Sequence, residues 1–293
     1  MSIIDAIVQG LIQGLTEFLP ISSSGHLSIF QYFTGQSGEA SLLFVVLLHF
    51  GTLVAVFIAF HQTIWELVVE CFGFLGDLFT GKLFANKPSP KRRMLYLLAL
   101  AEVPLLLVLL FKDLVTGLST DNDVVWEGVA LLITGVLLYL ADRVVSGHKK
   151  AATMKPRDAL TVGFTQLVAT LPGISRSGST LSAGLLCGLD RSYAVAFSFI
   201  MSIPAVLAAN ALELKDALEQ NLTIELVPTI IGIIVAAVSG LLAIKMVKYL
   251  VNTERLRIFS WYTFIMGTLV LTAGIIDHMA GGVIQNFFIG LYQ

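Results

Sequence analysis

Long apolar runs alternate with short polar segments along almost the whole chain. Six runs are long enough to cross a bilayer as helices, because about 20 helical residues cover about 30 Å of hydrocarbon. They lie at about residues 41–61, 94–111, 125–145, 192–213, 226–250 and 259–277. The pattern predicts an all-α polytopic membrane protein.

Two further apolar regions are each divided by a polar break, at Pro20–Ser24 and at Pro172–Ser177. The flanking pieces are residues 3–19 and 22–34, then residues 159–171 and 177–189. Each piece is too short to span comfortably, and one broken helix is the simpler interpretation. A re-entrant helix pair is favoured in both regions, because polar residues gather where irregular backbone needs internal partners.

An amphipathic segment at residues 64–85 differs from the spans. It carries Glu66, Glu70 and Asp77 among apolar residues, a pattern typical of a helix at a membrane surface. We therefore expect it to lie along the interface rather than to cross.

Basic residues are distributed unevenly between the two sets of loops. Apart from Arg176, 17 of the 18 basic residues remain, and only Lys112 and Lys215 fall on one side. The other fifteen lie in or beside residues 62–93, 143–158, 191 and 245–258. The positive-inside rule then predicts cytoplasmic basic loops and both termini outside. This alternation requires that both broken regions return to the side from which they entered.

Composition agrees with this class. The 293 residues are 56% hydrophobic and 13% charged, with a mean hydropathy of +0.85 and a net charge of −2. These values exclude a large soluble domain and indicate no nucleic-acid partner. Cys71 and Cys187 have no CxxC pattern and no histidine nearby, so we expect inert thiols. The N-terminal MSIID lacks the basic residues of a signal peptide and is expected to be retained.

The second broken region repeats the first at an offset of 153 residues. The matched positions include Asp5 with Asp158, Gly10 with Gly163, Gln13 with Gln166, Ser22 with Ser175, Ser24 with Ser177, and Gly25 with Gly178. Three spans separate the copies, and an odd number inverts the second copy. We therefore expect one membrane domain over residues 1–293, with inverted halves at about 1–145 and 153–293, whose broken helices meet near the midplane.

The first break carries candidate catalytic groups. Gln13 and Glu17 are four residues apart and share a helix face. Glu17 is either a hydrogen-bonded neutral acid or a base, a metal ligand or the residue that orients His26. His26 can exchange a proton or attack phosphorus.

Three serines and a glycine follow the proline of this break. One serine suffices to cap a helix, whereas Ser22, Ser23 and Ser24 together provide more donors than capping needs. Hydroxyls, free N–H groups and the positive end of a helix bind anions well. The segment ending at Gly25 is therefore a candidate phosphate site.

Arg176 is the one basic residue that we place at membrane depth away from the end of a span. Snorkelling to the surface is the alternative, but the distance from a midplane break is long. Its forked guanidinium suits phosphate oxygens. Neighbouring donors and flexible positions are Ser175, Ser177, Thr180, Gly173 and Gly178.

Three other polar residues have weaker claims. Glu102 lies within a span and is expected to pair with a hydroxyl or with Arg176. His49, also within a span, is expected to be structural. Asp190 is the expected N-cap of the next helix.

The two motifs resemble those of the undecaprenyl-diphosphate phosphatase family, the bacitracin-resistance phosphatases of bacteria. That family carries (E/Q)xxxE followed by a serine-rich turn ending in Gly-His, matched by Gln13, Glu17 and the SSSGH of residues 22–26. Its PGxSRSxxT motif is matched without a gap from Pro172 to Thr180. The resemblance in layout covers nearly the whole chain.

The resemblance implies an enzyme of the bacterial inner membrane with an outward-facing site. It would remove the terminal phosphate of undecaprenyl diphosphate, recycling the lipid carrier of cell-wall synthesis and conferring bacitracin resistance. Members often require a divalent cation such as Mg²⁺ or Ca²⁺. Many members have glutamate where this chain has Gln13, so Glu17 would be the only carboxylate ligand, or the diphosphate would hold the cation.

The expected phosphate-binding set is Gln13, Ser22, Ser24, Gly25, Gly173, Ser175, Arg176, Ser177 and Thr180. Glu17 and His26 would transfer protons, and Ser23 is the candidate nucleophile, with attack by His26 or water as alternatives. A lipid flippase or transporter is the competing class, because it too uses inverted repeats with broken helices. The expected partners are a polyprenyl diphosphate and the bilayer, and a homodimer is left open.

Overall fold

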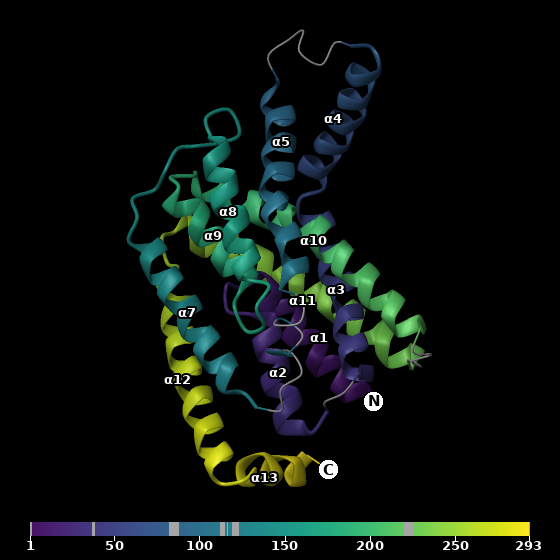
Figure 1. Cartoon of the computed structure of the whole chain (residues 1–293), viewed down its shortest axis with the longest axis vertical. Coiled ribbons are helices and arrows are strands. Elements are labelled where there is room, and N and C mark those ends of the chain that lie inside the picture. Colours follow the sequence, from purple (N-terminus) through teal and green to yellow (C-terminus); the bar gives the residue numbers. More distant parts are fainter. Residues whose placement is uncertain are drawn as a thin grey trace.

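The computed structural model describes residues 2–36, 39–81, 88–111, 115, 117–118, 123–219 and 225–292. Every element named among these residues is a helix, which confirms the all-α class (Figure 1). The helices are α1 (Ile3–Phe18), α2 (Ser23–Thr34), α3 (Glu39–Ala59), α4 (His61–Phe79), α5 (Pro90–Glu102), the 3-10 helix η1 (Val103–Leu110), α7 (Val125–Asp142), α8 (Pro156–Val168), α9 (Arg176–Leu186), α10 (Arg191–Glu219), α11 (Leu226–Asn252), α12 (Arg257–Met279) and α13 (Val283–Tyr292).

The long helices coincide with the predicted spans. In the described part of the chain, α5 with η1, α7, α10, α11 and α12 are each long and apolar enough to cross a membrane. The sixth candidate is the pair of α3 and α4, which is bent by 87°. The span predicted at 94–111 begins earlier, at Pro90, and changes to 3-10 geometry at Val103–Leu110. Pro104 lies in that first turn and lacks an N–H group to continue the α-helix.

Both predicted breaks interrupt the helices as expected. The first separates Phe18 from Ser23, and the second separates Val168 from Arg176. Each contains a residue with positive φ, Ser22 at 74° and Gly173 at 79°. Glycine adopts this conformation without strain. At Ser22 the same conformation is unusual for a residue with a side chain and marks a backbone held in place by its surroundings.

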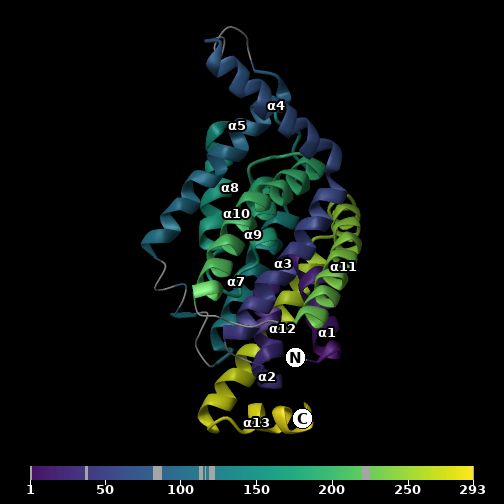
Figure 2. The ribbon, with the colours of Figure 1, turned by 90° about the vertical axis from the view of Figure 1, so that its right-hand side faces the viewer.

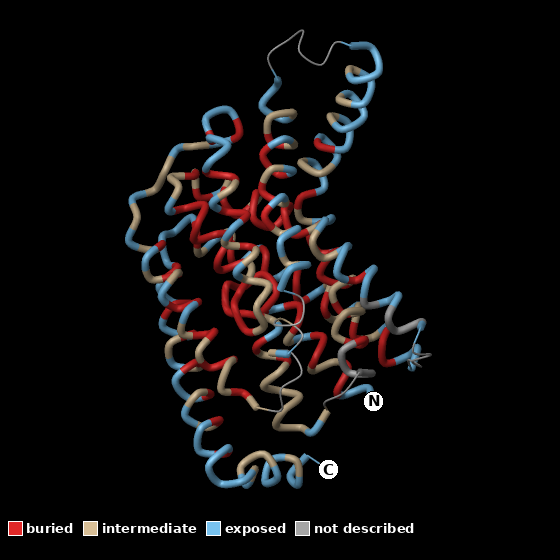
Figure 3. Tube along the Cα trace, in the orientation of Figure 1, coloured by how far each residue is buried: buried red, intermediate tan, exposed pale blue. Residues whose placement is uncertain are grey.

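The short helices pack inside a frame of long ones. Helix α1 lies against α11, and α8 lies against α5 and η1. Helices α7 and α12 form an extended pair, and α3 packs against α10 and α11. The buried residues concentrate in the middle of the molecule, where both breaks lie (Figure 3). The fold therefore places its polar breaks in its best-protected region.

The matched aspartates of the repeat lie in the first turns of α1 and α8. Asp5 Oδ2 accepts a hydrogen bond from Ser2 N at 3.0 Å, and Asp158 Oδ2 accepts one from Lys155 N at 2.9 Å. Both aspartates stand at the third position of their helix, where a carboxylate satisfies a free N–H group and favours the positive helix end. The match at an offset of 153 therefore has a structural cause.

Helix α4 forms a hairpin with α5 at one end of the molecule (Figures 1 and 2). The acidic residues predicted for a membrane surface pair with α5: Lys91 Nζ lies 2.9 Å from Glu66, and Arg92 bonds Glu70 and Asp77. The opposite side of α4 exposes large apolar residues, Trp65, Phe72 and Phe79 among them. That this helix lies along the membrane surface stays a prediction.

Helix α13 lies at the opposite end from the hairpin, and sequence reasoning missed it (Figures 1 and 2). Its ten residues are apolar but too few to span. Gly281 and Gly282 both have positive φ and separate it from α12. Asp277 Oδ1 then accepts a bond from Ile284 N at 2.6 Å, which caps the start of α13.

We predict that Gly14→Ala lowers the free energy of unfolding by about 1–3 kcal/mol, as overpacking does. A methyl group at Gly14 would overlap the backbone of Ala236 and the hydroxyl of Ser239, which cannot both move aside. Gly76→Ala in α4 is the matched control, because nothing lies within 4 Å of its added carbon. Thermal melting in detergent should separate the two variants. Equal melting temperatures would show that α1 and α11 do not need this close approach.

Candidate active site

The two breaks interlock through a reciprocal pair of contacts. Ser24 Oγ, after the first break, accepts a hydrogen bond from Gly173 N at 3.2 Å. Ser177 Oγ, after the second break, donates to the carbonyl oxygen of Leu19 at 3.3 Å. Ser24 and Ser177 are matched positions of the repeat, so each copy contacts the other through the same serine, one as an acceptor and the other as a donor.

The matched glycines permit this close approach. A Cβ at Gly25 would lie 3.3 Å from Gly173 Cα, and a Cβ at Gly178 would lie 3.2 Å from the carbonyl oxygen of Pro20. In both cases the neighbour is backbone and has little freedom to shift. Gly25 and Gly178 are therefore explained by contact between the breaks.

Ser22 and Ser175 are the N-caps of α2 and α9. Ser22 Oγ accepts from Gly25 N at 3.2 Å, and Ser175 Oγ accepts from Gly178 N at 3.0 Å. Capping is thus what the structure shows for this matched pair. The hydroxyls of Ser24 and Ser177 lie 3.4 Å and 3.3 Å from those of the caps.

Glu17 is buried at the end of α1, and four polar groups surround its carboxylate. Oε2 accepts hydrogen bonds from Gln13 Nε2 at 3.0 Å and from Ser23 Oγ at 2.6 Å. Oε1 accepts from Arg176 Nη2 at 2.5 Å. His49 Nε2 lies 3.7 Å from Oε2. A guanidinium and two donors therefore compensate this carboxylate, as a charge at membrane depth requires.

The two residues that bond Glu17 from outside its own helix are matched positions of the repeat. Ser23 is the first residue of α2, and Arg176 is the first residue of α9. This matched position holds serine in the first motif and arginine in the second. Both side chains donate a hydrogen bond to the carboxylate of Glu17. Helix starts carry free N–H groups and a positive partial charge, so an anion beside Ser23 and Arg176 would meet both.

Most N–H groups of the Arg176 guanidinium remain able to bind a ligand. Its side chain is 21% exposed, against 6% for the carboxylate of Glu17. In the described part of the chain, the side-chain hydrogen bond that it makes uses Nη2 alone. The remaining N–H groups can bind a phosphate without breaking the contact to Glu17.

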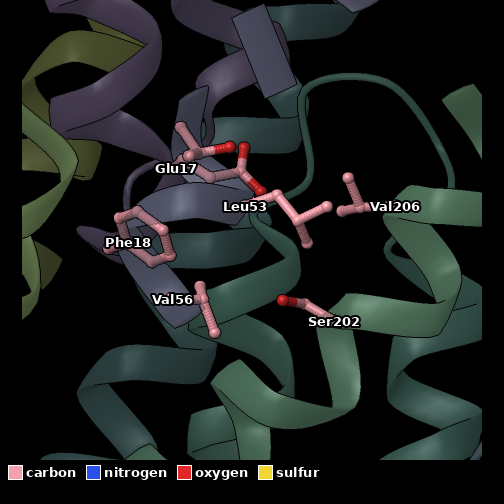
Figure 4. A pocket seen from close by; sticks show the side chains of 7 residues that line it. Glu17, Phe18, Leu53, Val56, Ser202 and Val206 are labelled. Atoms are coloured by element: carbon pink, nitrogen blue, oxygen red, sulfur yellow. The ribbon is translucent and has the colours of Figure 1, made fainter. Parts of the chain in front are cut away.

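A pocket opens beside Glu17 between α1, α3 and α10 (Figure 4). It is a small, partly open hollow with no room for a water molecule, and it is lined by Glu17, Phe18, Thr52, Leu53, Val56, Ser202 and Val206. Thr52 Oγ1 donates to the carbonyl oxygen of His49, and Ser202 Oγ donates to that of Phe199. Because both hydroxyls use their protons inside their own helices, the pocket offers a mainly apolar wall next to the carboxylate.

His26 lies at the second helical turn of α2 but faces away from Glu17. Its Nδ1 lies 2.7 Å from the carbonyl oxygen of Ser22, and its Nε2 lies 2.7 Å from Tyr262 Oη of α12. The option that Glu17 orients His26 is therefore wrong. The local pattern did not reveal Tyr262, which is 236 positions away.

Two other expected partners differ from those in the structure. Thr180 Oγ1 donates to the carbonyl oxygen of Arg176 at 2.8 Å and pairs with Ser198 of α10, so it faces that helix. Glu102 accepts from Gln166 Nε2 at 2.9 Å and is near enough to Arg176 for a favourable charge interaction, although no hydrogen bond joins the two. Gln166 is the repeat partner of Gln13, so the amide binds a carboxylate in both halves.

Asp190 caps α10 as predicted, because its Oδ1 accepts from Tyr193 N at 3.0 Å. Other residues at the site were missed. His49 was expected to be structural, yet it lies beside Glu17. Trp126 Nε1 donates to the carbonyl oxygen of Pro172 at 2.7 Å and so fixes the second break to α7. The one sequence feature that could have indicated His49 as a site residue is its polar side chain within an apolar span.

The residues present do not fit a cation held by the protein alone. In the part of the chain that the structure describes, no group of three or more His, Cys, Asp or Glu side chains is arranged to hold a metal ion. Glu17 already accepts three hydrogen bonds, one of them from Gln13, whose amide nitrogen points at it. Beside Glu17 the first motif thus provides an amide, Gln13, rather than a second carboxylate.

Comparison with known proteins agrees with the motifs. A model of the bacitracin resistance protein BacA matches residues 6–269. The undecaprenyl-diphosphatase of Alkaliphilus metalliredigens is 39% identical over 273 residues, covering 92% of this chain and 98% of the relative. The undecaprenyl-diphosphatase of Methanobrevibacter smithii is 38% identical over 281 residues, covering 95% of this chain and 100% of the relative. This chain therefore belongs to the BacA family of bacitracin resistance proteins.

Proposed function

We propose that this protein is an integral-membrane phosphatase that hydrolyses undecaprenyl diphosphate to undecaprenyl phosphate and inorganic phosphate. Its relatives over nearly their full lengths are undecaprenyl-diphosphatases. The observation that carries the proposal is the buried carboxylate of Glu17, bonded to a hydroxyl and a guanidinium at two converging helix starts. By recycling the carrier lipid of cell-wall synthesis, this activity confers resistance to bacitracin.

The diphosphate binds at the starts of α2 and α9. The free part of the Arg176 fork holds oxygens of the terminal phosphate, and the N–H groups of both first turns add donors. These groups are fixed before the substrate arrives, because the interlocked breaks hold them. Preorganised donors of this kind stabilise the charge that redistributes in the transition state.

Ser23 acts as the nucleophile and Glu17 as its base. Ser23 Oγ attacks the terminal phosphorus, and its proton passes to Glu17 Oε2, 2.6 Å away. The bond to the bridging oxygen breaks, and this oxygen leaves on undecaprenyl phosphate with the proton from Glu17. Water then attacks the phosphoserine, gives one proton to the serine oxygen and releases inorganic phosphate. Direct attack by a water molecule that Glu17 orients is the alternative.

A divalent cation, Mg²⁺ or Ca²⁺, would in this proposal be held mainly by the diphosphate of the substrate and would neutralise part of its charge. Diphosphate oxygens are good ligands for such hard cations, which often keep few protein ligands. This arrangement agrees with a first motif that offers one carboxylate, Glu17, and an amide, Gln13. EDTA should therefore reduce phosphate release without lowering the melting temperature of the substrate-free protein.

The protein lies in the bacterial cell membrane with both termini outside and its site facing outward. The uneven loop charges support this orientation. The α4–α5 hairpin, which adjoins basic loops, and α13 lie at opposite ends of the molecule (Figure 2). The halves about 1–145 and 153–293 form inverted repeats. Their equivalent packing supports this, since α1 lies against α11 as α8 lies against α5 and η1.

Phosphate release by the purified protein tests the activity. In detergent with undecaprenyl or farnesyl diphosphate, the wild type should release inorganic phosphate. Glu17→Gln keeps the hydrogen-bonding shape but cannot accept a proton, so turnover per folded molecule should fall by about 10²–10⁴-fold, with folding checked by thermal melting because Arg176 loses its counter-charge. Movement of the lipid across liposome membranes without hydrolysis would favour a flippase instead. Near-normal activity of Glu17→Gln would leave Glu17 with a structural role.

Cysteine labelling tests the orientation. Lys150 and Glu225 are both exposed, and the loop charges place them on opposite sides. In a background with Cys71→Ser and Cys187→Ser, an impermeant thiol reagent applied from outside should label Glu225→Cys and not Lys150→Cys. Inside-out vesicles should reverse the result. Labelling of Lys150→Cys from outside would invert the orientation and place the site on the cytoplasmic side.

A further inference from the structure

The contacts of His26 define which of its nitrogens can react. Nδ1 lies 2.7 Å from the carbonyl oxygen of Ser22, and a carbonyl oxygen only accepts hydrogen bonds. In the neutral ring, Nδ1 must therefore carry the proton, and Nε2 carries the lone pair. Any proton that His26 exchanges in turnover, and any bond that it forms, must involve Nε2.

The hydroxyl of Tyr262, on α12, is hydrogen-bonded to Nε2 of His26. This hydroxyl lies 2.7 Å from Nε2, and the two rings are stacked with centroids 5.7 Å apart and planes 11° apart. Because Nε2 of the neutral ring is an acceptor, the tyrosine hydroxyl is the donor. The bond to Ser22 and the contact with Tyr262 together leave the imidazole ring of His26 one orientation.

Tyr262 can give up this contact more easily than a core residue could. Its side chain is on the outer surface of α12 and is 37% exposed. The next residue, Thr263, is fully buried and bonds within its own helix. The helix backbone is thus fixed by its inner face, while the tyrosine side chain is partly exposed.

We propose that Tyr262 is a positioning residue for the hydrolysis, holding Nε2 of His26 until a P–OH group of the substrate takes the place of its hydroxyl as the donor. The proposal rests on the proposed function, in which His26 lies one helical turn after the nucleophile Ser23 on α2. His26 would then accept a hydrogen bond, or the proton itself, from that P–OH group through Nε2 rather than attack phosphorus.

A double-mutant cycle separates positioning from structural support. Tyr262→Phe keeps the stacked ring and removes the hydroxyl, and should lower kcat by about tenfold or more through misplacement of the ring, with KM within about threefold. His26→Asn keeps a donor for the carbonyl oxygen of Ser22 but has no Nε2. In that background, Tyr262→Phe should change kcat by less than about twofold, because its effect passes through Nε2. Tyr249→Phe on α11, also an exposed tyrosine, is the matched control.

Nitrogen NMR of ¹⁵N-histidine protein tests the same contact without catalysis. The chain has five histidines, and His26→Asn identifies the resonances of His26. We expect a protonated Nδ1, and an Nε2 resonance that moves in Tyr262→Phe and not in Tyr249→Phe. Inorganic pyrophosphate or farnesyl diphosphate should move the same resonance in the wild type.

The possible results separate the role of Tyr262 from the proposed phosphatase activity. Independent effects in the double-mutant cycle, with a lower melting temperature of Tyr262→Phe, would make Tyr262 a structural residue and overturn the proposal. A proton on Nε2, or an Nε2 resonance unaffected by Tyr262→Phe, would overturn it as well. A wild type that releases no phosphate would instead remove the proposed function, and the NMR measurement would still show whether Tyr262 holds Nε2.

Discussion

One ion pair joins the two halves of this protein: the Glu17 carboxylate at the end of α1 and the Arg176 guanidinium at the start of α9, 159 positions apart. Neither charge is stable alone at membrane depth, because the surrounding lipid cannot solvate it. Each therefore needs the other, and both breaks must come together in the folded chain. The close helix packing, the N-caps and the serine contacts between the breaks all hold Glu17 and Arg176 next to each other.

The site uses the same local structure twice, with one difference. Ser22 and Ser175 cap their helices, Ser24 and Ser177 contact the opposite break, and Gly25 and Gly178 allow backbone to approach backbone. These pairs bring two similar helix starts together. In the proposed function, the difference between Ser23 and Arg176 provides a nucleophile at one start and a positive charge at the other.

Local sequence pattern predicted the helices, the breaks and the residues around Glu17, because each depends on hydrophobic runs, prolines and helical spacing. The contact between Ser23 and Glu17 spans six positions and follows from a tight turn. Contacts made across the bundle could not be predicted in this way. His49 lies near Glu17 only because α3 packs beside α1. Tyr262 reaches His26 only because α12 and α2 both pack against α7. The partner of Glu102 was missed for the same reason, and α13 was missed because ten apolar residues do not indicate a span.

The central claim is that Arg176 binds phosphate as a fork rather than as a point charge, and Arg176→Lys tests it most directly. Lysine keeps the positive charge that Glu17 needs but loses the planar pair of donors. Steady-state kinetics on farnesyl diphosphate in detergent, with folding checked by thermal melting, should show a collapse of turnover and an unchanged melting temperature. A well-folded lysine variant whose turnover stays within about threefold of wild type, a barrier change under about 0.7 kcal/mol, would contradict the account.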